Sequence, residues 1–337
     1  MKKSKQKRQH LIPQVYLNLW KNEEGNLNVA ELDTNKVVKN YLKKSIAKFG
    51  IKNNYYSIKA GQANCIKEDA DCFFSDLLKY TVEINGRRIS NTMDMNRNFE
   101  NIDEWIIKDE NGRSINNKKV KNEIQKMKIN EIEDKWNLKY ENYWGEFANQ
   151  LEKKIQYMAN NIPIFKKDYL VNFFCSMDWR SIISNNDFNR SYYSAMKLIY
   201  TVFEQEEDQD LIEELRYNIL LKKYRDFLND NGLIYEQAQR IKKQFEFIFL
   251  VANESKFFIT SDNPSFFYGE RELQIGIMPI SPRILLKLKR KQRIIDNLNC
   301  DDKYNIFYID DKEVEKYNEL IQKNADKYII YINNYDK

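Results

Sequence analysis

The chain has 337 residues, of which 42% are hydrophobic, 14% aromatic and 31% charged. Its 22 Tyr, 19 Phe and 5 Trp supply a large buried core and exclude a wholly disordered chain, while 9 Gly and 5 Pro exclude collagen-like and Gly/Ser-linker classes. Lys and Arg total 55 against 50 Asp and Glu, and five of these positive charges lie in the first eight residues, so the rest of the chain is neutral.

The basic tail comprises Lys2, Lys3, Lys5, Lys7 and Arg8. A basic chain end can contact phosphate groups, and the alternative is a frayed, solvated terminus. We expect any nucleic-acid affinity to depend on the tail more than on the neutral body. Deleting residues 1–8 would then lower the log–log salt slope on duplex DNA by at most roughly 4.5.

Cysteine and histidine are too scattered for a zinc site. Cys65, Cys72, Cys175 and Cys300 form no C-x-x-C pair, and His10 is the single histidine. We therefore expect no bound metal and no cofactor, and metal should not be needed for folding. No apolar stretch approaches the roughly 20 residues of a membrane span, and no signal peptide follows the basic start. These features predict a cytoplasmic protein without a membrane partner.

Residues 1–115 read as a mixed N-terminal segment that includes the basic tail. Residues 10–20 fit a strand or a short helix with Pro13 in its first turn. Strand-like runs occupy 27–32 and 36–38, on either side of a polar turn, and residues 73–80 read as a helix.

Residues 116–244 have helical periodicity. Apolar residues three or four apart from residue 117 predict one amphipathic helix of about 40 residues, bent or broken once and ended near Pro163. Further helices are predicted at 167–184 and 191–203, then through Leu228 after the acidic run 204–210, and at 234–243.

Residues 245–337 read as mainly β. Residues 245–251 and 257–260 predict a hairpin around a turn at 253–256. Strand-like runs follow at 273–280, 284–288, 305–309 and 327–332, with a helix at 311–325. The fold class is α+β, with a helical central region packed on a mainly antiparallel sheet formed largely by the C-terminal third. We expect the three regions to form one integrated globular unit.

The usual catalytic signatures of nucleotide-binding loops, zinc proteases and α/β-hydrolases are absent. Glu254-x-Lys256 matches part of a metal-dependent nuclease pattern, but its aspartate follows rather than precedes it. The most unusual segment is the run Phe258-Ile-Thr-Ser261-Asp262-Asn-Pro264. Asp262 either closes a structural Asx-turn or points into a cleft as a general base or hydrogen-bond anchor, and both alternatives stay open.

Motifs along nearly the whole chain, roughly residues 8–332, resemble an uncharacterised bacterial family, the domain-of-unknown-function family 4238. The resemblance implies a shared fold, and it associates the chain with accessory genes near mobile elements and phage-defence systems. It rests on His10-x-x-Pro13-Gln14-x-Tyr16-Leu17, Phe258–Pro264, Glu131-x-Glu133 with Glu141, Met-Pro279-Ile-Ser-Pro282, Val314-x-x-Tyr-Asn318 and the segment ending in Asp178-Trp179-Arg180. Asp178-Trp179 departs from the glutamine expected there.

Two functions remain. In the first, the chain is a nuclease-like hydrolase acting on RNA or DNA in a phage-defence, abortive-infection or toxin role, metal-independent or weakly metal-dependent. His10 would be its general acid/base, and Arg180 would stabilise the developing phosphate charge. The alternative is a non-catalytic sensor or interaction protein of a defence system, with a protein partner or a second copy. The candidate catalytic residues are His10, Gln14, Glu141, Arg180, Ser261 and Asp262, and we expect His10 and Asp262 to lie in one site.

Overall fold

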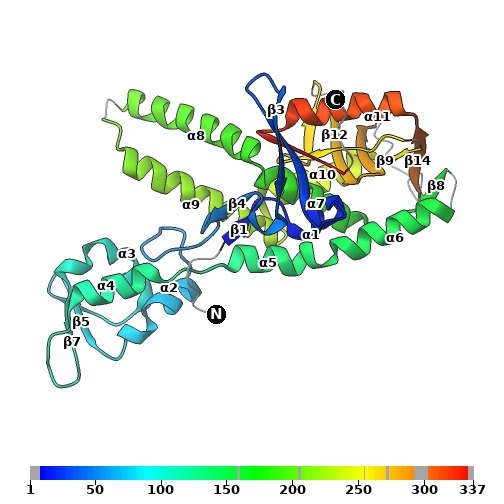
Figure 1. Ribbon diagram of the computed structural model, residues 1–337. Helices are drawn as coiled ribbons and strands as arrows, with labels where there is room; N and C mark the ends of the chain where they lie inside the picture. Colours follow the sequence, from blue (N-terminus) through cyan, green and yellow to red (C-terminus); the bar gives the residue numbers. More distant parts are fainter. Residues whose placement is uncertain are drawn as a thin grey trace. The chain divides into compact units, whose positions relative to one another are not determined.

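The computed structural model describes residues 8–157, 160–203, 206–253, 255–270, 273–291 and 303–332 (Figure 1). The tail up to Lys7, Glu254 and Cys300 lie outside these residues. The chain divides into two compact units that interleave in sequence. Unit 1 contains residues 8–9, 52–135 and 191–229, and unit 2 contains residues 10–51, 136–190 and 230–332. The sequence prediction instead divides the chain into three consecutive regions.

Both units combine helices with antiparallel strands, so the α+β class is confirmed. Four elements carry the chain across the division between the units: β1 (Arg8–His10), β4 (Ile51–Asn53), α5 (Glu131–Lys139) and α8 (Ile182–Val202).

Unit 1 contains a three-stranded antiparallel sheet in the order β6-β5-β7. Its strands are β5 (Thr81–Ile84), β6 (Arg87–Ile89) and β7 (Ile106–Lys108). Its helices are α2 (Lys67–Phe74), η3 (Ser75–Leu77), α3 (Thr92–Arg97), η4 (Phe99–Glu104), α4 (Asn117–Lys126) and α9 (Gln209–Leu228). Part of its core is aromatic, because the ring of Phe74 lies 5.5 Å from that of Phe99 and 6.4 Å from that of Trp105.

The larger sheet of unit 2 has six strands in the order β11-β12-β13-β9-β14-β8. All neighbours are antiparallel except β9 and β14. The strands are β8 (Asn161–Pro163), β9 (Phe245–Ala252), β11 (Phe266–Tyr268), β12 (Ile275–Ser281), β13 (Ile284–Arg290) and β14 (Lys303–Ile309). Five of the six come from the C-terminal third, as the sequence predicts.

The second sheet of unit 2 joins the two ends of the chain. Its order is β10-β15-β2-β3, and every pair is antiparallel. The strands are β2 (Leu27–Leu32), β3 (Val38–Lys44), β10 (Thr260–Ser261) and β15 (Tyr328–Tyr331). The predicted strand at 36–38 is therefore too short, since β3 continues to Lys44 with polar side chains suited to a sheet edge.

The helices of unit 2 together contribute aromatic side chains to its core. They are α1 (Gln14–Leu17), η1 (Asn18–Trp20), η2 (Ile46–Lys48), η5 (Glu141–Tyr143), α6 (Trp144–Tyr157), α7 (Lys167–Arg180), α10 (Gly232–Gln244) and α11 (Asp311–Asn324). Trp144 of α6 stacks on Phe173 of α7, with ring centroids 3.8 Å apart. Helix α7 also packs against α10, where Trp179 Nε1 donates to Gln237 Oε1 at 2.8 Å.

Three predicted helices have different boundaries. The 40-residue helix is three helices, α4, α5 and α6, and not one helix broken once. Its first break arises because Ile129 exchanges backbone hydrogen bonds with Ile58. The segments predicted at 167–184 and 191–203 are instead α7 and a longer α8, because Ser181 is extended and its Oγ accepts a hydrogen bond from the N–H of Ser184.

The predicted hairpin between residues 245–251 and 257–260 does not form. Strand β9 pairs with β13 and β14, while β10 pairs with β15. The residues before β10 are hydrogen-bonded to α11. Asn318 of that helix accepts from the N–H of Ile259 and donates to the carbonyl of Phe257, both at 2.9 Å. A side-chain amide thus replaces the strand partner that the pattern suggested.

Candidate functional site

His10 and Gln14 contact each other at the start of unit 2. Pro13 directly precedes α1, and the short helix places Gln14 Nε2 2.8 Å from His10 Nε2. His10 is half-buried and Gln14 is exposed. Burial, and secondly the charge of Arg180, lower the pKa of His10, so its imidazole is neutral at pH 7. Either side chain of this pair can form a hydrogen bond with a ligand.

Arg180 and Glu141 form a buried ion pair beside this segment. Arg180 is 1% exposed, and its guanidinium donates to Glu141 Oε1 and to the backbone carbonyl of His10. The guanidinium also lies 4.4 Å from the ring centroid of Trp136. The carboxylate of Glu141 therefore neutralises the arginine within the fold. Through these contacts the structure brings together His10, Gln14, Glu141 and Arg180.

The side chains of Ser261 and Asp262 accept hydrogen bonds from backbone N–H groups in and beside the second sheet of unit 2. One carboxylate oxygen of Asp262 accepts from the N–H of Asp326 at 2.8 Å, and the other accepts from Lys327 at 2.8 Å and Tyr328 at 3.0 Å. Ser261 Oγ accepts from the N–H of Asn263 at 3.1 Å.

Asp262 is 6% exposed, and burial raises the pKa of its carboxyl group to about 6 although the three backbone donors act in the opposite direction. None of the hydrogen bonds of Ser261 or Asp262 within the described residues reaches His10, Gln14, Glu141 or Arg180. The geometry of Asp262 is that of an anchor for the entry into β15.

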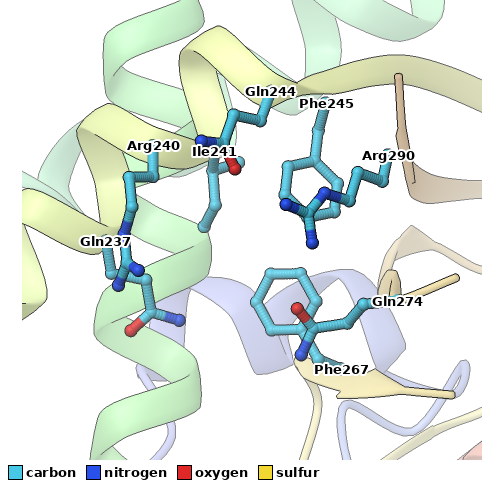
Figure 2. Close-up of a pocket in the computed structure, with 8 residues that line it drawn as sticks. All are labelled: Gln237, Arg240, Ile241, Gln244, Phe245, Phe267, Gln274 and Arg290. Atoms are coloured by element: carbon cyan, nitrogen blue, oxygen red, sulfur yellow. The ribbon is translucent and has the colours of Figure 1, made fainter. Parts of the chain in front are cut away.

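A cavity of about 630 Å³ opens elsewhere in unit 2, between α10 and one end of the six-stranded sheet (Figure 2). We call it the two-arginine pocket. Helix α10 contributes four lining residues at positions i, i+3, i+4 and i+7, which share one helix face. The pocket is lined by Gln237, Arg240, Ile241, Gln244, Phe245, Phe267, Gln274 and Arg290.

The described lining residues of the two-arginine pocket have a net charge of +2, because Arg240 and Arg290 are the charged residues among them. Arg240 is exposed, and none of the ion pairs or hydrogen bonds found among the described residues involves its guanidinium. Arg290 ends β13, across the cavity from α10 (Figure 2). The sequence analysis missed these residues. Their signal was the polar stripe Gln237, Arg240 and Gln244 on a helix that also buries Ile241.

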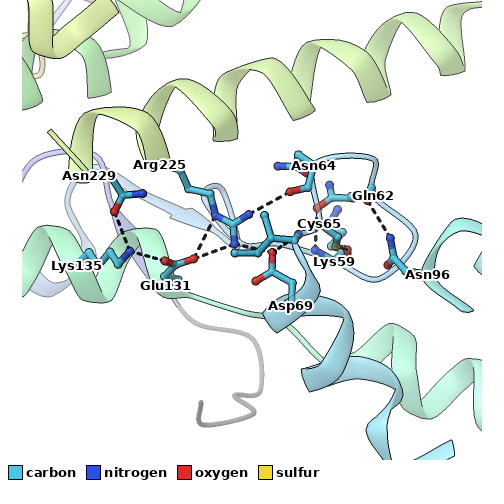
Figure 3. Close-up of polar contacts among 11 residues, drawn as sticks. Lys59, Gln62, Asn64, Cys65, Asp69, Asn96, Glu131, Lys135, Arg225 and Asn229 are labelled. Carbon is cyan, nitrogen blue, oxygen red and sulfur yellow. Dashed lines mark hydrogen bonds and ion pairs between the residues drawn. The ribbon is translucent and has the colours of Figure 1, made fainter. Parts of the chain in front are cut away.

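Unit 1 holds a polar cluster around Arg225 of α9 (Figure 3). The guanidinium donates to Asp69 Oδ2 at 2.6 Å, to Glu131 Oε2 at 2.8 Å and to the carbonyl of Asn64 at 3.1 Å. Asp69 also accepts from the N–H of Ile66 at the start of α2. Arg225 thus joins α9 to α2 and α5, and the cluster is explained by packing.

The three described cysteines, Cys65, Cys72 and Cys175, form no disulfide. Cys175 is buried, as its aromatic neighbours indicate, whereas Cys72 is half-buried. Burial raises the pKa of Cys65 to about 12, so its thiol is unreactive at neutral pH. Within the part of the chain that the structure describes, no group of three acidic, cysteine or histidine side chains could hold a metal ion. Over the same residues, no helix is both long and apolar enough to cross a bilayer.

No curated protein and no solved structure matches the chain. A family profile, in contrast, covers residues 8–334, which is nearly the whole chain and includes every motif on which the resemblance rests. The chain therefore belongs to the family described as protein of unknown function (DUF4238).

Proposed function

We propose that the chain is a non-catalytic sensor that binds a small anionic ligand in the two-arginine pocket, within a bacterial defence system. The observation that carries the proposal is the charge of the pocket, since the described lining residues include Arg240 and Arg290 but no acidic side chain. Guanidinium groups bind phosphate and carboxylate through paired N–H donors. The volume of 630 Å³ suits a small molecule, since such sites range over roughly 300–1,000 Å³.

The chemistry of the lining favours binding over catalysis. General acid–base catalysis needs a group that gains or loses a proton near neutral pH. The described lining residues comprise arginine, glutamine, phenylalanine and isoleucine, and none of these titrates in that range. The pocket can therefore hold and orient an anion but cannot move a proton to or from it.

Two of the candidate catalytic side chains are already bonded within the fold, which also favours the sensor over the hydrolase. Arg180 is paired with Glu141, and both carboxylate oxygens of Asp262 accept backbone hydrogen bonds. A phosphodiester would have to displace those partners to reach either group. The hydrolase remains a second candidate because His10 is neutral, half-buried and close to Gln14, as a general base would be.

Anion binding is tested by the shift in thermal midpoint that pyrophosphate produces in the full-length chain. A ligand that binds only the folded state raises the midpoint, because it stabilises that state by RT ln(1 + [L]/Kd). We expect a shift in the wild type and its loss in the double variant Arg240→Gln/Arg290→Gln. The matched control is Arg87→Gln/Arg88→Gln, which removes the same charge from two exposed arginines of β6 in unit 1 and should keep the shift.

An equal shift in both double variants, or none in the wild type, would overturn the proposal. The hydrolase candidate is tested in parallel by incubating the wild type and His10→Gln with single-stranded RNA and DNA. Cleavage that the His10 variant lacks would favour the hydrolase over the sensor.

A further inference from the structure

The two-arginine pocket offers aromatic rings as well as charge. Phe245 is buried at the start of β9, and Phe267 of β11 is half-buried, with ring centroids 5.7 Å apart and an interplanar angle of 56°. A simple inorganic anion would make no use of these rings. A ligand with a flat apolar part would, because ring stacking adds to the free energy of burial.

Contacts with two neighbouring residues, Gly276 and Phe174, fix the position of the Phe267 ring. Phe267 pairs with Gly276 of β12, and a Cβ atom on that glycine would lie only 2.9 Å from Phe267 Cε1. The absence of a side chain at Gly276 therefore lets the ring rest against the strand. Phe174 of α7 holds it from another direction, with centroids 5.2 Å apart. The ring is thus preorganised and not free to collapse into the cavity.

Three glutamine side chains complete the lining, and each carries both a donor and an acceptor. Gln237 has its orientation set by the hydrogen bond that its Oε1 accepts from Trp179. Figure 2 shows Gln274 and Arg290 on the sheet side of the cavity, whereas Gln237 and Arg240 come from α10. Paired donors and acceptors of this kind match the edge of a nucleobase, which presents both groups in one plane.

We infer that the ligand of the two-arginine pocket is a nucleoside phosphate, with its base against Phe267 and its phosphate bound by Arg240 and Arg290. This inference rests on the proposed function and specifies the anion that the pocket takes. Aromatic stacking and guanidinium contacts to phosphate are together the usual basis of nucleotide binding without sequence selectivity. A free nucleotide and the end of a single-stranded nucleic acid share this chemistry.

The test is isothermal titration of the full-length chain with AMP, GMP, CMP and UMP, with pyrophosphate, and with a single-stranded RNA tetranucleotide. At least one nucleotide should bind tenfold or more tightly than pyrophosphate. Phe267→Leu should remove that advantage and leave pyrophosphate affinity within twofold, whereas Arg240→Gln/Arg290→Gln should weaken both by tenfold or more. Phe307→Leu, a change at a residue of β14 that is 54% exposed, is the matched control and should bind as the wild type does.

The outcomes separate the two proposals. If pyrophosphate binds through the two arginines but no nucleotide binds more tightly, or if Phe267→Leu changes nothing, the nucleotide inference is overturned and the anion sensor stands. If no anion binds, both fail. Tighter binding of the tetranucleotide than of any mononucleotide supports the inference with a nucleic-acid end as the source, and the reverse order supports it with a free nucleotide. Unchanged thermal midpoints of the variants without ligand show that each is folded.

Discussion

The hydroxyl of Tyr16 lies 2.6 Å from the hydroxyl of Thr260, across 244 residues of sequence. Tyr16 also donates to the carbonyl of Pro279 at 2.8 Å, so its single proton is used there and Thr260 is the donor between the two hydroxyls. All of these groups are buried. Two hydrogen bonds therefore join the three motifs around Tyr16, Thr260 and Pro279. The folding of unit 2 accounts for these three motifs, on which the resemblance to the family partly rests.

Removal of the Tyr16 hydroxyl should destabilise the protein. Tyr16→Phe leaves the hydroxyl of Thr260 and the carbonyl of Pro279 without this partner, which costs about 1–3 kcal/mol in the free energy of unfolding. Urea denaturation measures the loss. Tyr157→Phe is the matched control, because Tyr157 is 86% exposed and its variant should stay within about 0.5 kcal/mol of the wild type. A Tyr16→Phe variant as stable as this control would contradict the role of the hydroxyl.

Asp262 should make stability depend on pH. Its pKa is about 6 in the folded chain, above the value of 3.8 for an unperturbed carboxyl, so the folded state holds the proton more tightly. The stabilisation is present at low pH and is lost as the pH rises through 6. Relative to Asp262→Asn, which cannot titrate, the wild type should lose about 1 kcal/mol between pH 5 and pH 7.

The measurement for Asp262 is urea denaturation of both proteins at several pH values. Glu319→Gln, at an exposed position of α11, should show no such trend against the wild type. A difference between the wild type and Asp262→Asn that is flat, or that grows in favour of the wild type with rising pH, would show that the carboxyl is ionised throughout.

The lowered pKa of His10 should make stability depend on pH in the opposite sense, with loss of stability at low pH. Burial and Arg180 lower its pKa below 6.5, so the folded state favours the neutral imidazole. The stabilisation is present above pH 6.5 and is lost as the pH falls through the folded-state pKa. Compared with His10→Gln, the wild type should become less stable on acidification from pH 7 to pH 5. An NMR titration of the single histidine gives the pKa directly, and a value at or above 6.5 would refute this prediction.

Loss of Arg225 should be costly because it leaves a buried charge. Asp69 has a side chain that is only 1% exposed, so Arg225→Met should destabilise the chain by about 3–5 kcal/mol. The double variant Asp69→Asn/Arg225→Met should recover part of that loss. Lys222→Met, which breaks an exposed pair on the same helix, should cost at most about 1 kcal/mol. Equal losses for Arg225→Met and the double variant would mean that the carboxylate charge is not the cause.

Gly276→Ala should affect the two-arginine pocket without changing a lining residue. The new Cβ atom would meet Phe267 Cε1 at 2.9 Å and Leu288 Cδ1 at 3.0 Å, so the ring of Phe267 must move, at about 1–3 kcal/mol. Titration should show weaker nucleotide binding and unchanged pyrophosphate binding. Gly145→Ala, in the open surroundings of α6, should instead stabilise the chain by roughly 0.5–1 kcal/mol. Unaltered nucleotide affinity in Gly276→Ala would argue against stacking on Phe267.

The sequence predicts the local elements of this protein better than their partners. Strand Leu27–Leu32 and the strands after residue 273 follow from alternation and apolar runs, which are local properties. The partner of β10 does not, because Asn318, 59 residues away from Ile259, takes the place that a hairpin strand would have. Periodicity also joined α4, α5 and α6 into one helix, since the pairing of Ile129 with Ile58 is a tertiary contact that leaves no trace in the spacing.

Prediction of the candidate site had a similar limit. Unusual polar motifs identified Asp262 and Arg180. Both are buried, and their charged groups bond to other groups of the same chain. The residues of the two-arginine pocket are ordinary in sequence, and only the packing of α10 beside the ends of β11 and β13 makes Arg240 and Arg290 neighbours of one cavity. Unusual sequence motifs therefore point to residues that the fold requires, whereas the residues that line a cavity can be of ordinary type and spacing.

The strand order β10-β15-β2-β3 has a consequence for the protein during its synthesis. Strand β15, the last one described, lies between β10 and β2, so both remain without a neighbour on that side until residues 328–331 have left the ribosome. Until then the ribosome carries a β2–β3 ribbon with an open edge, and such edges pair readily with other chains. A stop codon before β15 would therefore release a chain with two unprotected strand edges, for which we expect aggregation and proteolysis in place of a shortened working protein.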